Sequence, residues 1–224
     1  MKPWRQLDAC AVPEDGNELQ LWQRDTEFSI RLKRGGELMN SRAFASEQAL
    51  ATLICPRLVG RKRLRVLVGG LGLGHTLAAA LAALPEDATV VVAELSAGVV
   101  KWNRGALGHL AQHPLNDPRV DVYLGDVRDL LDGHRAKRHT WDAVLLDVDN
   151  GPEGLTRRGN DALYSRRGID EIRLSLRKGG MVGVWSAHES PMFHRRLQRI
   201  GFEVEEHPVR ARPATGVSKR KRRG

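Results

Sequence analysis

The feature that most constrains the fold is a short apolar run followed directly by glycines and then by a helical pattern. Residues 66–68 read Val-Leu-Val, residues 69–74 read Gly-Gly-Leu-Gly-Leu-Gly, and residues 75–84 have a helical composition. Glycines let a backbone turn tightly and approach a ligand, and a helix start adds N–H groups without partners in the helix. The pattern predicts a buried strand, a tight turn and a helix, which is the repeating unit of an open α/β sheet.

The chain continues to alternate between apolar runs and helical patterns as far as residue 209. Apolar runs predict strands at 66–68, 89–93, 120–124, 143–146, 181–185 and 202–209, and helical patterns predict helices at 75–84, 97–109, 127–131, 168–176 and 191–200. Strands without polar alternation are typical of a parallel sheet that is buried on both faces. We therefore expect an α/β fold with a Rossmann-like, mostly parallel sheet and helices on both faces.

The N-terminal region has a different pattern. Apolar and polar residues alternate at 19–24 and 28–33, a short strand is predicted at 38–39, and a helix at 47–58. A period of two is the signal of a half-buried strand. The expected organisation is a small antiparallel β-hairpin region over residues 1–45, an α/β domain over 46–209 and a tail over 210–224.

The tail carries most of the positive charge. The chain has a formal net charge of +9, and residues 210–224 contain seven basic residues and no acid, which leaves +2 for residues 1–209. A basic run without apolar periodicity favours disorder and weak attraction to polyanions. Nucleic acid is therefore not expected as a partner, apart from weak contacts through this tail.

Composition argues against membrane and metal-binding classes. No run approaches the ~18 apolar residues of a membrane span, and the first eight residues lack the apolar core of a signal peptide. Cys10 and Cys55 cannot form a disulfide scaffold and show no metal-ligand spacing. We expect a cytoplasmic protein without a membrane span or a metal.

Residues with ligand-binding chemistry follow four successive predicted strands. The glycines, including Gly70, Gly72 and Gly74, follow the first strand, Glu94 the second, Gly125-Asp126-Val127 the third and Asp147 the fourth. Open α/β sheets bind ligands at the carboxyl ends of their strands. An acid at the position of Glu94 can accept hydrogen bonds from both ribose hydroxyls of a nucleoside, and Asp126 can accept one from the exocyclic amine of adenine. No Gly-Lys-Ser/Thr follows the glycines, so the loop is not a P-loop. Together the four strand ends look like a class I S-adenosylmethionine-binding domain.

Within that group the sequence resembles the spermidine synthase (polyamine aminopropyltransferase) family. The matching segments are residues 66–74, 92–95 (Val-Ala-Glu-Leu), 117–120 (Asp-Pro-Arg-Val), 125–126 (Gly-Asp) and 141–147 (Trp-Asp-Ala-Val-Leu-Leu-Asp). The resemblance covers roughly residues 19–201, including the β-hairpins. It implies that Gly70 and Gly72 line the nucleoside, that Glu94 binds its ribose and that Asp126 with Val127 holds adenine. The implied co-substrate is S-adenosylmethionine or its decarboxylated form, the implied acceptor is a small cationic amine, and the family commonly forms dimers.

The catalytic segment departs from the family. Asn150 stands where the family has its catalytic aspartate, and an amide cannot accept a proton from an ammonium as a carboxylate can. Leu73 stands in the stretch where the family's glycine loop has an aspartate that helps to hold the donor. We expect Asp149 to be the proton acceptor and Asp147 to orient donor or amine.

Three functions remain open at this stage. The first is transfer of an aminopropyl group from decarboxylated S-adenosylmethionine to a polyamine or other amine. The second is an S-adenosylmethionine-dependent small-molecule methyltransferase, which Leu73 and Asn150 favour. The third is a non-catalytic nucleoside-binding protein.

Overall fold

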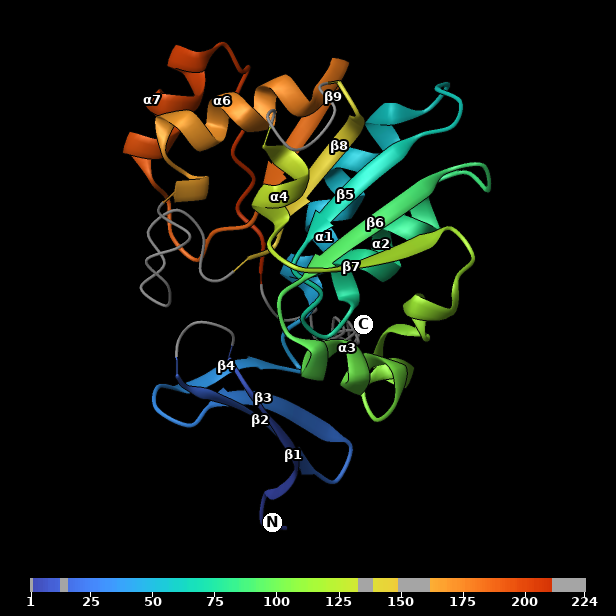
Figure 1. The fold of residues 1–224 in the computed structure, drawn as a ribbon, viewed down its shortest axis with the longest axis vertical. Coiled ribbons are helices and arrows are strands. Elements are labelled where there is room, and N and C mark those ends of the chain that lie inside the picture. The colour runs from blue at the N-terminus through green and yellow to red at the C-terminus, as the bar shows by residue number, and fades with distance from the viewer. Residues whose placement is uncertain (1, 13–15, 133–138, 149–161, 211–224) are drawn as a thin grey trace, which may run out of the picture.

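The chain forms two sheets, a small antiparallel one at the N-terminus and a larger parallel one (Figure 1). The structure, a computed structural model, describes residues 2–12, 16–132, 139–148 and 162–210. No helix within these ranges combines the length and apolar character needed to cross a bilayer.

The N-terminal sheet has four strands in sequential order, β1 (Arg5–Ala11), β2 (Glu18–Arg24), β3 (Glu27–Leu32) and β4 (Gly36–Asn40). The alternation predicted for β2 and β3 is confirmed, because Leu19, Leu21, Phe28 and Ile30 are buried on one face. The sequence analysis missed β1, whose apolar and polar residues do not alternate cleanly and whose pairing with β2 is irregular between Gln6 and Asp8.

The larger sheet is parallel, with strand order β7-β6-β5-β8-β9. Its strands are β5 (Arg65–Gly69), β6 (Thr89–Glu94), β7 (Val120–Leu124), β8 (Trp141–Leu146) and β9 (Leu176–Val184). The helices are α1 (Ala45–Ile54), α2 (His75–Ala83), α3 (Ala97–Arg104), α4 (Val127–Leu131), α6 (Arg166–Ser175) and α7 (Pro191–Ile200). Three short 3-10 turns lie at Cys55–Leu58, Gly108–Ala111 and Pro114–Asn116.

Helices cover both faces of this sheet, as its apolar strands predict. Alternate residues of β5 pack in opposite directions: Val66 and Val68 face α1 and α2, whereas Leu67 faces α4 and α6. The same division runs through β6 and β8, and all six residues of β8 are buried. A strand buried on both faces has no room for polar alternation, which explains its continuous apolar run. The predicted fold class is confirmed.

The predicted strand at residues 202–209 is wrong. This segment has no strand assignment, and β9 ends the sheet on that side. A strand needs a hydrogen-bonding neighbour as well as an alternating sequence, and β9 is not paired with this segment. Two predicted helices, 47–58 and 97–109, are also shorter than expected, because each gives way to a 3-10 turn beside Pro56 or after Gly105.

The small sheet docks on α3 at the carboxyl edge of the large sheet (Figure 1). Asp8 Oδ2 accepts hydrogen bonds from Lys101 Nζ and Trp102 Nε1, each at 2.8 Å. These bonds hold the pKa of Asp8 at about 2, below its usual range. The buried residues of the small sheet join the same apolar core as α1, α2 and α3. The N-terminal region therefore forms one wall beside the strand ends.

Candidate active site at the carboxyl edge of the sheet

The four strand ends singled out from the sequence meet at one edge. Gly69, the last residue of β5, is opposite Ala93 in β6 and Leu146 in β8. Hydrogen bonds continue past the strands: Gly70 N–H donates to Ala93 O (2.9 Å), Asp147 N–H to Gly69 O (2.8 Å) and Gly125 N–H to Glu94 O (2.9 Å). The residues after β5, β6, β7 and β8 are therefore neighbours, as predicted.

The glycine loop needs glycine for two separate reasons. Gly70, Gly72 and Gly74 all have left-handed φ values, of 89°, 52° and 85°, which side-chain-bearing residues rarely adopt. A Cβ on Gly70 would also overlap the carbonyl oxygen of Asp147. Gly74 then forms the N-cap of α2, so the loop delivers the chain into the helix start. Leu73, in contrast, is fully buried in the core and does not line a ligand site.

Glu94 contacts this loop directly. Its Oε2 accepts from Leu71 N–H at 3.0 Å and its Oε1 from Ser96 N–H at 2.8 Å. Burial raises the pKa of Glu94, while these backbone donors act in the opposite direction. A carboxylate has about four lone-pair sites, so each oxygen can still accept from a ribose hydroxyl. The ribose-binding role remains a prediction that fits this position.

Asp126 and Val127 lie at the start of α4. Asp126 is the N-cap, with Oδ1 accepting from Arg128 N–H at 2.9 Å and Oδ2 accepting from the Arg128 guanidinium at 2.7 and 3.0 Å. Val127 is buried, and its Cγ2 would lie 3.1 Å from a Cβ built on Gly69. The two residues therefore border the glycine loop, and contact with adenine stays a prediction for both.

The sequence analysis missed Glu47, which lies beside Asp147. Glu47 is in the first turn of α1, and no motif distinguished it from an ordinary solvent-facing helix residue. Burial, and then the charge of Asp147, raise the pKa of Glu47 to about 8. Burial also raises the pKa of Asp147. Neither carboxyl forms an ion pair with a Lys or Arg of the described residues. Each carboxyl therefore opposes ionisation of the other.

Thr76 connects the two elements that carry this pair. Its Oγ1 lies 2.7 Å from Asp147 Oδ2 and 3.1 Å from the backbone oxygen of Glu47. A hydroxyl has a single hydrogen to donate, and a backbone carbonyl can only accept. Both contacts are hydrogen bonds only when Asp147 carries a proton and donates it to Thr76, which in turn donates to the carbonyl. The geometry therefore agrees with a raised pKa for Asp147.

Aromatic and imidazole groups adjoin the pair on α1 and α2. His75 stacks on Phe44, with 5.0 Å between ring centroids, and burial lowers the pKa of the imidazole. His75 Nε2 is buried and has no hydrogen-bond partner among the described residues. Asp149 and Asn150, the other residues of the expected catalytic segment, lie outside those residues. The described ranges hold no group of three or more His, Cys, Asp or Glu arranged for a metal ion.

Comparison with known proteins supports the fold and leaves the family open. No protein-family model matches the sequence, and no curated protein matches it significantly. Among solved structures, a spermidine synthase in complex with the transition-state analogue AdoDATO is similar with a TM-score of 0.62 and 16% identity. The spermidine synthase from Thermotoga maritima gives 0.64 and 16%, and MnmC2 from Aquifex aeolicus gives 0.54 and 22%.

These matches cover 88%, 88% and 85% of this chain, which spans 63%, 64% and 66% of the three solved chains. At such identities the similarity establishes the fold: a methyltransferase-like parallel sheet preceded by a small antiparallel sheet.

Proposed function

We propose that the protein is a transferase that moves an aminopropyl group from decarboxylated S-adenosylmethionine to a small cationic amine. The observation that carries the proposal is the carboxyl pair of Glu47 and Asp147, placed beside the glycine loop without a cationic partner among the described residues. An ammonium between these groups would favour ionisation of both carboxyls and would be bound in return. The fold shared with two spermidine synthases, one holding AdoDATO, supports a donor of this class.

The chain's own residues divide the work of such a reaction. The glycine loop and Glu94 would hold the nucleoside, with Asp126 and Val127 at its base. The attacking nitrogen forms a bond to carbon as the carbon–sulfur bond breaks, and the sulfonium leaves as a neutral thioether. Alignment therefore supplies most of the rate, and the nitrogen must lose a proton.

Carboxylates on the acceptor side provide the proton acceptor. Asp149 is our expected base and Asp147 the orienting group. Glu47 adds a carboxyl whose pKa of about 8 is close to neutral pH, where a general base is most effective.

A methyltransferase that uses S-adenosylmethionine itself is the second candidate. Leu73 is buried, so its position offers no carboxylate to a donor amine. Asn150 stands where the resembled family has a catalytic aspartate. Both features favour a protein that keeps the nucleoside site and uses other acceptor chemistry.

Calorimetry with S-adenosylmethionine and with its decarboxylated form, followed by mass spectrometry of products from putrescine, tests the proposal. An aminopropylated product is expected only with the decarboxylated donor. A methylated product formed from S-adenosylmethionine would support the second candidate, and binding of neither nucleoside would overturn both.

Two variants then locate the base. Asp149→Asn should lower turnover by ~10²–10⁴-fold while nucleoside affinity changes little. Asn150→Asp should maintain or raise turnover with putrescine. Wild-type turnover in Asp149→Asn would remove Asp149 from the mechanism, and a loss in Glu47→Gln would then assign the proton to Glu47.

A further inference from the structure

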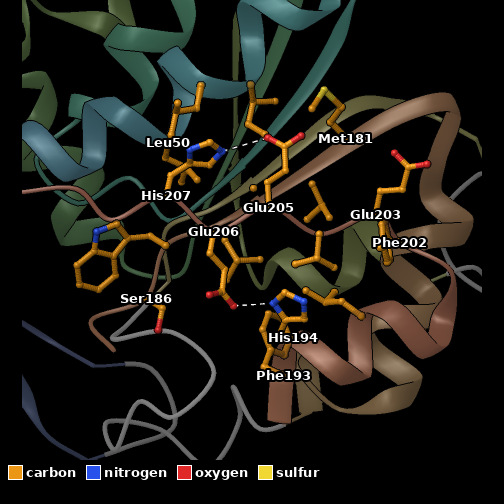
Figure 2. A pocket seen from close by; sticks show the side chains of 18 of the residues that line it. Leu50, Met181, Ser186, Phe193, His194, Phe202, Glu203, Glu205, Glu206 and His207 are labelled. Atoms are coloured by element: carbon orange, nitrogen blue, oxygen red, sulfur yellow. Dashed lines mark hydrogen bonds and ion pairs between the residues drawn. The ribbon is translucent and has the colours of Figure 1, made fainter. Parts of the chain in front are cut away.

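One edge of the parallel sheet lies open beside a long cleft. β9 pairs with β8 on one side only, and residues 179–184 of this strand carry no charged side chain. The cleft has a volume of about 1650 Å³ and is lined along the whole of β9, by α1 and α7, and by residues 201–209. Figure 2 shows Leu50 of α1 and Met181 of β9 at the cleft, together with Phe193 and His194 of α7.

The dimensions of the cleft fit an extended chain segment. Small-molecule sites in proteins are usually ~300–1,000 Å³, and this cleft is larger and follows a nine-residue strand. An apolar edge strand presents a row of unpaired backbone N–H and C=O groups, which a further strand can pair. The cleft therefore has the character of an empty strand position.

The far wall of the cleft is fixed at a distance from β9. Arg57 donates to both oxygens of Glu205, at 2.8 and 3.1 Å, and His194 pairs with Glu206 at 2.6 Å. Figure 2 shows Glu205 against His207 and Glu206 against His194. These contacts attach residues 205–206 to the 3-10 turn after α1 and to α7, while β9 remains unpaired.

We propose that residues 217–223 of the same chain occupy this cleft as an added strand, antiparallel to the wall formed by residues 202–209. Val209 lines the cleft, and fourteen residues follow Arg210. Fourteen residues can span up to ~46 Å, and a seven-residue strand needs only ~23 Å. Pro213 and Gly216 favour a turn between the wall and the returning segment.

Charge complementarity selects this occupant. The wall carries Glu203, Glu205 and Glu206, and residues 219–223 read Lys-Arg-Lys-Arg-Arg. A register with Val209 opposite Val217 places these three acids opposite residues 223, 221 and 220, all of them basic. Opposite charges on facing positions stabilise paired strands. The two arginines that could repel the segment are already paired, Arg57 with Glu205 and Arg177 with Asp142. This inference replaces the expectation of a tail without structure.

Disulfide trapping in the full-length chain tests the register. With Cys10→Ser and Cys55→Ala as background, Val204→Cys is combined with Arg222→Cys, since residues 204 and 222 face each other in this register. Opposed residues of antiparallel strands lie ~4.5–5.5 Å apart at Cα, within the range of a disulfide. We expect an intramolecular disulfide under mild oxidation, detected by mass and by non-reducing electrophoresis.

The matched control combines Val204→Cys with Val217→Cys. Residue 217 is closer to 204 in sequence, so a chain without fixed structure would bridge this control pair at least as fast. Faster bridging of the 204–222 pair supports the proposal, and equal or faster bridging of the control overturns it. Disulfides that form mainly between molecules would also overturn it, by assigning the cleft to a second copy.

Hydrogen exchange gives an independent readout. Deleting residues 211–224 should accelerate amide exchange in residues 181–184 of β9 by at least ~10-fold, because the outward N–H groups lose their partners. Exchange in residues 65–69 of the central strand β5 should stay unchanged. Unchanged exchange in β9 after the deletion would show that the segment does not cover this edge.

Discussion

Replacing Glu47 with Gln should change how the stability of the protein depends on pH. Burial and the neighbouring Asp147 raise the pKa of Glu47 from its ordinary value of 4.5 to about 8. Between these values the folded chain holds a proton that the unfolded chain has released. The free energy of unfolding of the wild type therefore falls as pH rises through this window, and the loss is complete above pH 8. Glu47→Gln has no proton to lose and escapes this decline.

The size of the effect follows from the width of the window. The difference between 8 and 4.5 is about 3.5 pH units, and each unit corresponds to ~1.4 kcal/mol, which sets an upper bound of ~5 kcal/mol. Glu47 keeps some solvent contact, so screening should reduce the effect to ~2–3 kcal/mol. The unfolding free energy of Glu47→Gln minus that of the wild type should increase by this amount between pH 5 and pH 9.

Urea unfolding at unit pH steps, followed by tryptophan fluorescence, measures this difference. Glu86→Gln is the matched control, because Glu86 is fully exposed near the other end of the sheet; its difference from wild type should stay flat. The midpoint of the wild-type curve belongs to the pair and not to one carboxyl. A difference for Glu47→Gln that is constant from pH 5 to pH 9 would refute the reasoning.

Three further predictions concern binding and stability. Glu94→Ala should weaken S-adenosylmethionine binding by ~1.5–3 kcal/mol in calorimetry, because two ribose hydroxyls lose their acceptor; unchanged affinity would reject the assignment. Gly70→Ala should lower the unfolding free energy by at least ~2 kcal/mol more than Gly36→Ala, since both glycines have left-handed φ and only the Cβ at 70 meets a backbone oxygen; equal losses in denaturant unfolding would contradict this. Asp142→Ala should destabilise the fold by ~3–5 kcal/mol, because the buried Asp142 carboxylate accepts from two arginines and a backbone N–H; a loss below ~1 kcal/mol in the same assay would show that the arginines find other partners.

Local sequence determined the α/β architecture and the positions of the nucleoside-site candidates. Apolar runs such as residues 66–68 identified strands buried on both faces, because burial on two sides excludes polar alternation. The residue that follows each run must lie at the carboxyl edge of a parallel sheet. For that reason Gly70, Glu94, Asp126 and Asp147 could be placed side by side before any contact was known.

Tertiary structure alone decided what lies against those strand ends. Thr76 meets Asp147 across 71 residues of sequence, and the packing of α1 against α2 brings Glu47 to the same place. No local pattern marks Glu47, since its pKa reflects burial and a neighbouring carboxyl and not its place in a helix. The segment 202–209 shows the same limit: its alternation permits a strand, but a strand forms only where a neighbour supplies hydrogen bonds, and β9 is paired only with β8.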